Sequence, residues 1–172
     1  PSGIWEYSVE GYYKRMSDYL DYRGGAKLLM NHHIETDVIN TQGHAYGVEL
    51  QVKKQVGKLN GWMSYTYSRT FLRQNDKRIE KPVNNGDWYP TEYDKPHDFK
   101  FVGNYKFTHR YSMSINVDYS TGRPTTIPAG QYYDESTQSM RVYYTERNSY
   151  RIPDYFRTDI SFNIEPSHHL TL

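Results

Sequence analysis

Two alternating runs meet at a short corner in the stretch DFKFVGNYKFTHRYSMSINVDYS, residues 98–120. In the second run the odd positions 111–119 are Tyr, Met, Ile, Val and Tyr, whereas the even positions 112–120 are all polar. Successive residues of a strand point to opposite faces, so each run predicts a strand with one apolar and one polar face. The first run follows the same pattern, except at Val102. The stretch therefore predicts a β-hairpin.

Each run has about the 9–11 residues that a tilted strand needs to cross a bilayer core. On the apolar face of the second run, Tyr111 and Tyr119 enclose the aliphatic side chains, as aromatic girdles enclose a lipid-facing band. A hairpin from a soluble β-sandwich also has one apolar and one polar face. The hairpin alone leaves both interpretations open.

The composition favours the membrane interpretation. The 172 residues include 19 Tyr but 6 Phe, and hydrophobic residues make up 36% of the chain. Tyrosine suits boundaries between apolar and wet surroundings, and a barrel wall needs no core of Leu, Ile and Val. No run of about 18 apolar residues predicts a spanning helix. The net charge of +1 argues against nucleic acid as a partner, and the absence of cysteine excludes thiolate metal sites.

Four further segments alternate in the same way, so six strands are expected: 5–14, 45–55, 59–69, 98–107, 111–120 and 155–164. A turn at 166–169 precedes the start of a seventh strand. The connections alternate between long polar segments (17–44, 70–96 and 121–154) and tight corners (56–58 and 108–110). Outer-membrane barrels have short turns at one end and long loops at the other, whereas long structureless loops are uncommon in compact domains. We therefore predict an all-β fold, an antiparallel transmembrane β-barrel segment.

Several stretches resemble the barrel of TonB-dependent outer-membrane receptors, particularly those of Bacteroidetes. They are AYGVEL (45–50), SYTYSRT (64–70), NNGDWYP (84–90), YDKPHDF (93–99), YSTGRP (119–124) and ERNSYRIPDYFRTDIS (146–161). The resemblance implies a partial barrel over residues 1–172, with the plug domain and the final strands lying elsewhere. Because six strands fall short of the roughly eight of the smallest barrels, this segment is not expected to close on its own.

The resemblance also implies a function: uptake of a scarce nutrient across the bacterial outer membrane, without enzymatic activity and without a cofactor. The implied partners are outer-membrane lipid, the rest of the barrel and plug, TonB, the nutrient, and a surface lipoprotein. The nutrient class stays open among siderophore, glycan, peptide and vitamin. Two alternative functions stay open, namely a hydrolase carried on a barrel and a soluble carbohydrate-binding sandwich.

Aromatic residues of the long connections are the candidate ligand contacts, because Tyr and Trp give large contact area at low entropic cost and can donate hydrogen bonds. They are Trp88, Tyr89, Tyr93, Tyr132, Tyr133, Tyr143 and Tyr144. The alternative is that these side chains pack the loops together or belong to the outer girdle.

Three other patterns are candidate sites. The histidines at 32, 33 and 44 lack metal-site spacing, which favours solvated loop residues and no metal site. His97–Asp98 with Ser64 or Ser68 could form a hydrolytic triad, but no local signal supports an activated serine. Charged residues on the polar faces are expected to pair across strands and hold the wall in register: Glu6, Glu10, Glu49, Lys53, Lys100, Asp118, Arg157 and Asp159.

Overall fold

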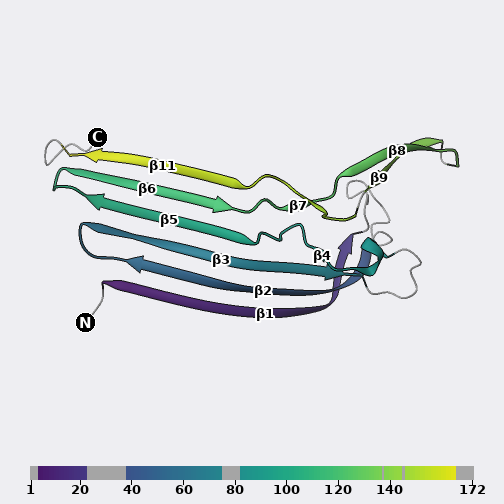
Figure 1. Ribbon diagram of the computed structural model, residues 1–172, viewed down its shortest axis with the longest axis horizontal. Coiled ribbons are helices and arrows are strands. Elements are labelled where there is room, and N and C mark those ends of the chain that lie inside the picture. The colour runs from purple at the N-terminus through teal and green to yellow at the C-terminus, as the bar shows by residue number, and fades with distance from the viewer. Residues whose placement is uncertain (1–3, 23–37, 75–81, 137, 145, 166–172) are drawn as a thin grey trace.

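The computed structural model describes residues 4–22, 38–74, 82–136, 138–144 and 146–165. Six long strands lie side by side in a single antiparallel sheet in the order β1-β2-β3-β5-β6-β11 (Figure 1). These strands are β1 (Trp5–Tyr22), β2 (Val38–Lys54), β3 (Leu59–Arg73), β5 (His97–Lys106), β6 (Tyr111–Ser120) and β11 (Tyr155–Ile164). The six expected strands are confirmed. The seventh expected strand lies outside the described residues.

The shorter elements belong to the long connections. A short 3-10 helix, η2 (Val83–Gly86), and β4 (Tyr89–Pro90) follow β3, and β4 pairs with the end of β3. The connection from β6 to β11 contains β7 (Pro124–Thr125), β8 (Pro128–Asp134), β9 (Ser139–Tyr144) and β10 (Tyr150–Arg151). Strands β8 and β9 form a separate hairpin, and β7 pairs with β10.

The strand register aligns the alternating residues into rows across the whole sheet. Ile115 of β6 is opposite Gly103 of β5 and Ile160 of β11, and the row beside it joins Val52, Met63, Phe101 and Val117. Because side chains alternate between faces, every apolar row falls on one side of the sheet. We call this side the apolar face and the opposite side the polar face. The predicted faces are therefore confirmed in all six strands.

No second layer covers the apolar face within the described part of the chain. Large side chains on this face are exposed, including Phe156 (68%), Ile160 (58%) and Phe162 (66%) of β11. The buried hydrophobic residues are few, namely Ile39, Ala45, Leu72 and Tyr89. A sandwich would bury this face as its core, so the sandwich alternative is wrong. The sheet is also open, with β1 and β11 at its two edges.

No helix in the described ranges has the length and apolar character needed to cross a membrane.

Short and long connections lie at opposite ends of the sheet (Figure 1). The β2–β3 and β5–β6 turns lie at one end, which we call the short-turn end. The connections from β1 to β2, β3 to β5 and β6 to β11 lie at the other, the long-loop end. The predicted alternation of connection lengths is confirmed.

The structure corrects the expected limits of all three long connections. In the second, expected over 70–96, β3 continues to Arg73. Residues 17–22 and 38–44 were expected in a loop, but they extend β1 and β2, with a register shift between Met16 and Tyr19. The hydrogen bonds between strands are made by main-chain groups and do not require alternating apolar side chains. The β1–β2 ladder therefore continues through residues 19–22 and 38–41, where the apolar–polar alternation is lost. Residues 121–154 were expected to break strands, yet they contain the β8–β9 hairpin. Its Pro128 is the first residue of β8, where a strand tolerates proline, and Gly130 follows a register shift.

Candidate functional site

The β8–β9 hairpin carries four of the seven predicted ligand residues and extends from the long-loop end (Figure 1). Its register places Tyr132 and Tyr143 on one face together with Arg141, which forms an ion pair with Asp134 (2.7 Å). All four tyrosines are exposed, by 40–63%. The hairpin therefore offers an aromatic surface on each side.

The second face of the hairpin is more apolar than the first. It presents Tyr133 and Tyr144 beside Met140 and Val142, and all four side chains are exposed. A flat apolar ligand or a sugar ring could stack on this face, whereas the first face adds an arginine for a charged or hydrogen-bonding ligand. The two faces thus suit ligands of different polarity.

The second connection places its three candidate residues in different surroundings. Tyr93 is 82% exposed. Trp88 is half-exposed and lies against His44, with ring centroids 4.4 Å apart, and beneath the guanidinium of Arg73 at 4.7 Å. Since His44 and Arg73 lie on the apolar face, Trp88 faces the outside of the sheet. Tyr93 is free at the surface of the loop, and Trp88 is part of a packed cluster.

Tyr89 is buried, with 1% of its surface exposed. It pairs with Leu72 in the short β3–β4 ladder, and its hydroxyl donates to Asp21 Oδ2 (3.0 Å). Burial, together with the charge of Asp21, raises the pKa of the Tyr89 hydroxyl, so this group stays protonated and donates. The structure gives Tyr89 a role in packing the connections together, and ligand contact by Tyr89 stays a prediction.

Asp94 joins the second and third connections to the end of β3. Its side chain is fully buried, and Arg69 Nε (3.1 Å) and the main-chain N–H of Thr70 (2.8 Å) both donate to its Oδ1. Arg151 Nη2 donates to Oδ2 (2.7 Å), and Nη1 donates to the carbonyls of Asp94 (2.6 Å) and Gly122 (2.7 Å). Burying a carboxylate carries a large desolvation penalty. The charge-assisted hydrogen bonds from the two arginines offset this penalty for Asp94.

Arg147 joins the third connection to the first two. It forms an ion pair with Asp21 at the end of β1 (3.0 Å) and also donates to the carbonyl of Tyr22. The side chain of Asn84 exchanges two hydrogen bonds with the Arg147 main chain (2.7 and 3.1 Å). Asn148 Nδ2 donates to the carbonyl of Pro90 (2.7 Å). We call the whole set the loop network, and its members are Asp21, Asn84, Tyr89, Asp94, Arg147, Asn148 and Arg151. It links all three long connections.

Close main-chain packing completes the loop network at Gly122. A Cβ at Gly122 would lie 1.8 Å from the Ile152 carbonyl oxygen, so no other residue fits this position without movement of the chain. Beside it, Asp154 accepts from the Gly122 N–H (2.9 Å) and from the Tyr119 hydroxyl (2.6 Å). These hydrogen bonds, that from Tyr119 first, hold the pKa of Asp154 below its usual value.

The lowered pKa of Asp154 predicts acid-sensitive order around Gly122. A depressed carboxylate pKa stabilises the folded form above the ordinary value of 3.8, and this contribution is lost as the pH falls through the lowered value. In the intact protein, hydrogen exchange at residues 119–123, corrected for intrinsic rates, should rise on going from about pH 5 to about pH 3. In Asp154→Asn, residues 119–123 should already exchange faster at neutral pH. The further rise between about pH 5 and about pH 3, which we call the acid step, should then be absent. The control Asp87→Asn, at an exposed position, should keep it, and an unchanged acid step in Asp154→Asn would contradict the assignment.

The charged residues of the polar face lie where the sequence predicts them. Glu6 and Lys53 are opposite each other and form an ion pair (3.7 Å), and Asp118 lies between Lys100 and Arg157 in register. Pairing across strands is not general, because Glu10 is opposite Glu49 and the Arg157–Asp159 pair lies within β11 (2.8 Å). These charges line the wall, and they do not converge on one point.

The histidine and triad hypotheses meet different outcomes. His44 is not a solvated loop residue, because it lies in β2 and its ring packs against Tyr46, Phe71 and Trp88. His32 and His33 lie outside the described residues. Within the described ranges, no three His, Cys, Asp or Glu side chains are grouped as a metal site needs.

The predicted alternative of a hydrolytic triad is wrong. His97 forms a hydrogen bond with the Tyr65 hydroxyl (2.8 Å) on the apolar face, whereas Ser64 and Ser68 belong to the polar face.

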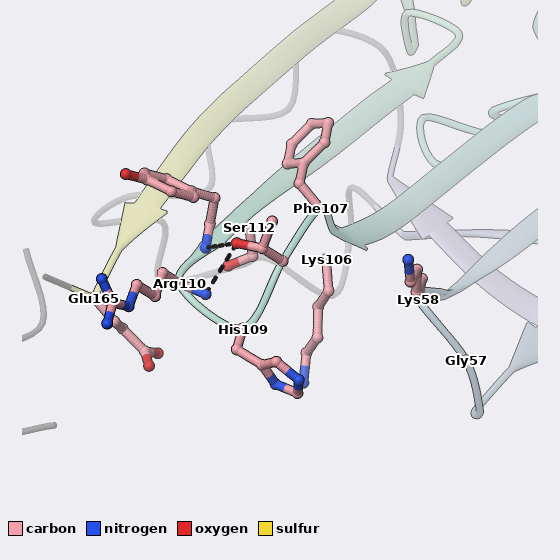
Figure 2. Close-up of a pocket in the computed structure, with 10 residues that line it drawn as sticks. Gly57, Lys58, Lys106, Phe107, His109, Arg110, Ser112 and Glu165 are labelled. Carbon is pink, nitrogen blue, oxygen red and sulfur yellow. Dashed lines mark hydrogen bonds between the residues drawn. The ribbon is translucent and has the colours of Figure 1, made fainter. Parts of the chain in front are cut away.

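A hollow of about 460 Å³ lies at the short-turn end and is lined by residues of the β2–β3 and β5–β6 turns (Figure 2). The connections that carry the predicted ligand residues lie at the opposite end of the sheet (Figure 1). Its lining is basic, with Lys58 and Lys106 joined by a main-chain hydrogen bond (2.8 Å) and with His109 and Arg110 from the β5–β6 turn. Thr108 Oγ1 holds this turn by accepting from two main-chain N–H groups. Glu165, which directly follows β11, also lines the hollow and places a carboxylate among these cations (Figure 2). Sequence reasoning treated these residues as tight corners alone.

The loop network was also missed from the sequence. Apart from Asp21, its residues lie in the motifs NNGDWYP, YDKPHDF and ERNSYRIPDYF, which indicate the family resemblance but not these contacts. Asp94, Arg147 and Arg151 look like solvated charges when each is read alone. The signal that was present is their closeness to Gly and Pro positions, where loops pack tightly.

The family model described as "TonB dependent receptor-like, beta-barrel" matches residues 2–172. No curated protein and no solved structure matches the chain at a significant level.

Proposed function

Since the chain belongs to the β-barrel family of TonB-dependent receptors, we propose that it forms wall and external loops of an outer-membrane receptor that takes up a scarce nutrient. The family match over almost the whole chain carries the proposal. The aligned apolar rows and the grouping of all long connections at one end support it, since a barrel wall needs both. The apolar face meets lipid, the polar face lines the lumen, and the long-loop end is external.

The exposed tyrosines are the proposed ligand surface of this part of the receptor. Tyr93 and the hairpin residues Tyr132, Tyr133, Tyr143 and Tyr144 present aromatic rings at the external end. Trp88 and Tyr89, which the sequence also suggested, support this surface from packed positions. The loop network connects the segments that carry these rings, so it presents them on an ordered base.

The remaining partners follow from the proposed role. The rest of the barrel pairs with the open edges at β1 and β11, and a plug fills the lumen against the polar face. TonB acts on the plug to release the nutrient inward. A surface lipoprotein would cover the external end, where the β8–β9 hairpin extends. The function is transport and not catalysis.

The test of this proposal is uptake by cells that carry the intact receptor. A deletion strain with restored receptor should gain growth on one limiting source among siderophores, glycans, peptides and vitamins, and the gain should require TonB. Growth that is independent of TonB would refute the proposed function.

The ligand surface has a separate test in the same cells. Tyr132→Ala/Tyr143→Ala and Tyr133→Ala/Tyr144→Ala each remove the two tyrosines of one hairpin face. We expect one pair to raise the half-saturating concentration at least tenfold, roughly the loss of one good aromatic contact. Tyr150→Ala, an exposed tyrosine of the same connection, is the matched control. Unchanged uptake in both double variants, with normal surface amounts, would exclude the hairpin as a ligand site.

A further inference from the structure

The β8–β9 hairpin is a two-stranded sheet whose outer edges pair with no other strand among the described residues. Its residues are exposed along nearly their whole length, and it extends away from the six-stranded sheet (Figure 1). A hairpin of two strands is only marginally stable in water, whereas a third strand can give such a sheet independent stability. The hairpin therefore has the form of a sheet that lacks its third strand.

The two edges of the hairpin differ in how they are protected. Exposed strand edges are commonly blocked by proline, bulges or lysine, because an unprotected edge can pair with another chain. The β8 edge has such protection, with Pro128 at its start and a register shift between Pro128 and Gly130. Strand β9 has the sequence SMRVYY, without proline, glycine or lysine. The β9 edge is therefore the one that is open to a further strand.

The main chain of residues 140–144 has no partner on the outer side of β9. In the part of the chain that the structure describes, these residues pair only with β8. Consecutive residues of a strand direct their N–H and C=O groups to opposite edges, so about half of these groups face outward. An extended chain presents N–H and C=O groups at the same spacing and can satisfy all of them at once.

The side chains of β9 leave this edge uncharged. Arg141 is the one charged residue of the strand, and its Nε forms an ion pair with Asp134 of β8 (2.7 Å). The guanidinium is therefore neutralised across the hairpin and is directed away from the free edge. Alternate residues of an added strand would lie against the more apolar face of the hairpin, beside Val142 and Tyr144.

We propose that the β9 edge binds peptide nutrients as an added strand, so that the ligand becomes the third strand of the hairpin. Of the four nutrient classes open to this receptor, linear peptides are the class defined by main-chain groups at strand spacing. The uncharged edge favours a neutral segment of about five residues with apolar side chains at every second position. The inference rests on the proposed uptake function and names the class of nutrient.

The first test measures binding by calorimetry between the intact receptor in detergent and a blocked heptapeptide of alternating valine and threonine. N-methylation at the even positions of this peptide removes the N–H groups of one edge, and N-methylation at the odd positions removes those of the other. We expect one methylated peptide to bind at least tenfold more weakly than the parent, and the other to bind within about twofold of it. Loss with both, loss with neither, or no binding of the parent peptide would overturn the proposal.

The second test removes outward N–H groups from β9. Val142→Pro and Tyr143→Pro alter neighbouring residues, whose N–H groups face opposite edges. An edge strand tolerates proline where its N–H faces outward, so one of these variants should keep the wild-type hydrogen exchange of β8. That variant should bind the parent peptide at least tenfold more weakly than the alanine variant of the same residue, which loses the side chain but keeps the N–H. Equal affinity of the two would overturn the proposal, and the methylated peptides decide independently of whether a proline variant folds.

Hydrogen exchange of residues 140–144 distinguishes the peptide from other occupants of the edge. In the receptor alone the outward N–H groups should exchange rapidly, and saturating parent peptide should slow them at least tenfold. Protection without peptide would show that a second copy or a surface lipoprotein already pairs with the edge, and would overturn the proposal. Absent peptide binding together with TonB-dependent growth on another source rejects this inference alone, whereas growth that is independent of TonB rejects the proposed function.

Discussion

Replacing Asp94 with alanine in the intact receptor is expected to release the external loops from the barrel. The carboxylate is fully buried and accepts from Arg69, Arg151 and the Thr70 main chain. Without this carboxylate, the guanidinium groups of Arg69 and Arg151 stay close together at partly buried positions, and no negative charge lies between them. Removing one partner of a buried ion pair costs about 3–5 kcal/mol, and the partial exposure of both arginines places the expected cost at the lower end, about 3 kcal/mol.

Hydrogen exchange measures this effect at the segments that Asp94 joins. Residues 91–96 and 147–153 should exchange faster by two orders of magnitude, since about 3 kcal/mol is roughly a hundredfold change in an opening equilibrium. Strands β5 and β6 should keep their protection. Asp87→Ala, an exposed carboxylate in the same connection, is the matched control and should change nothing. Protection of residues 147–153 equal to wild type in Asp94→Ala would show that the loops are held by other contacts.

Ile115→Arg is expected to prevent insertion or to destabilise the barrel strongly, whereas Asn116→Arg should fold nearly normally. The two residues are neighbours in β6, and the register places Ile115 on the apolar face and Asn116 on the polar face. Arginine on the lipid-facing side near the midplane costs about 2–4 kcal/mol, and a lumen position carries no such penalty. The folded fraction, read from the heat-modifiable shift of the intact receptor on a gel, measures the difference. Similar folded fractions for both variants would contradict the assigned faces.

A second measurement separates lipid contact from simple burial. A tryptophan in place of Ile115 should be quenched by brominated lipid, and a tryptophan in place of Asn116 should not. The native tryptophans fluoresce in both variants. The quenching of the wild-type receptor by the same lipid is therefore measured and subtracted. Equal quenching at both positions, or none at either, would rule out a lipid-facing band at this hairpin.

The strands and their faces could be predicted because alternation has a strict period of two. Met113, Ile115 and Val117 cannot all lie on one face in any other regular structure, so the hairpin, its partners and the end that holds the loops followed directly. The outer parts of β1 and β2 could not be predicted in this way. Their pairing is made by main-chain groups, and it continues through Asp21 and Asn40 without regard to side-chain polarity.

The candidate site was predicted less well because contacts between loops are not local. Tyr89 and Tyr93 have the same chemistry and lie in the same connection, yet one is buried and the other is exposed by 82%. What separates them is the partner Asp21, which lies 68 residues away from Tyr89. The four hairpin tyrosines were found as a group because they cluster in sequence. Their division between two faces required the register.

The sequence separations within the loop network indicate when the external surface becomes ordered during folding. The turns at the short-turn end close between neighbouring strands, but Arg151 follows Asp94 by 57 residues and Arg147 follows Asp21 by 126 residues. Contacts between residues far apart in sequence form slowly, because the loop-closure entropy is lost before the contact contributes stability. We therefore expect the hairpins to pair before the loop network closes, so that the external connections become ordered late in folding.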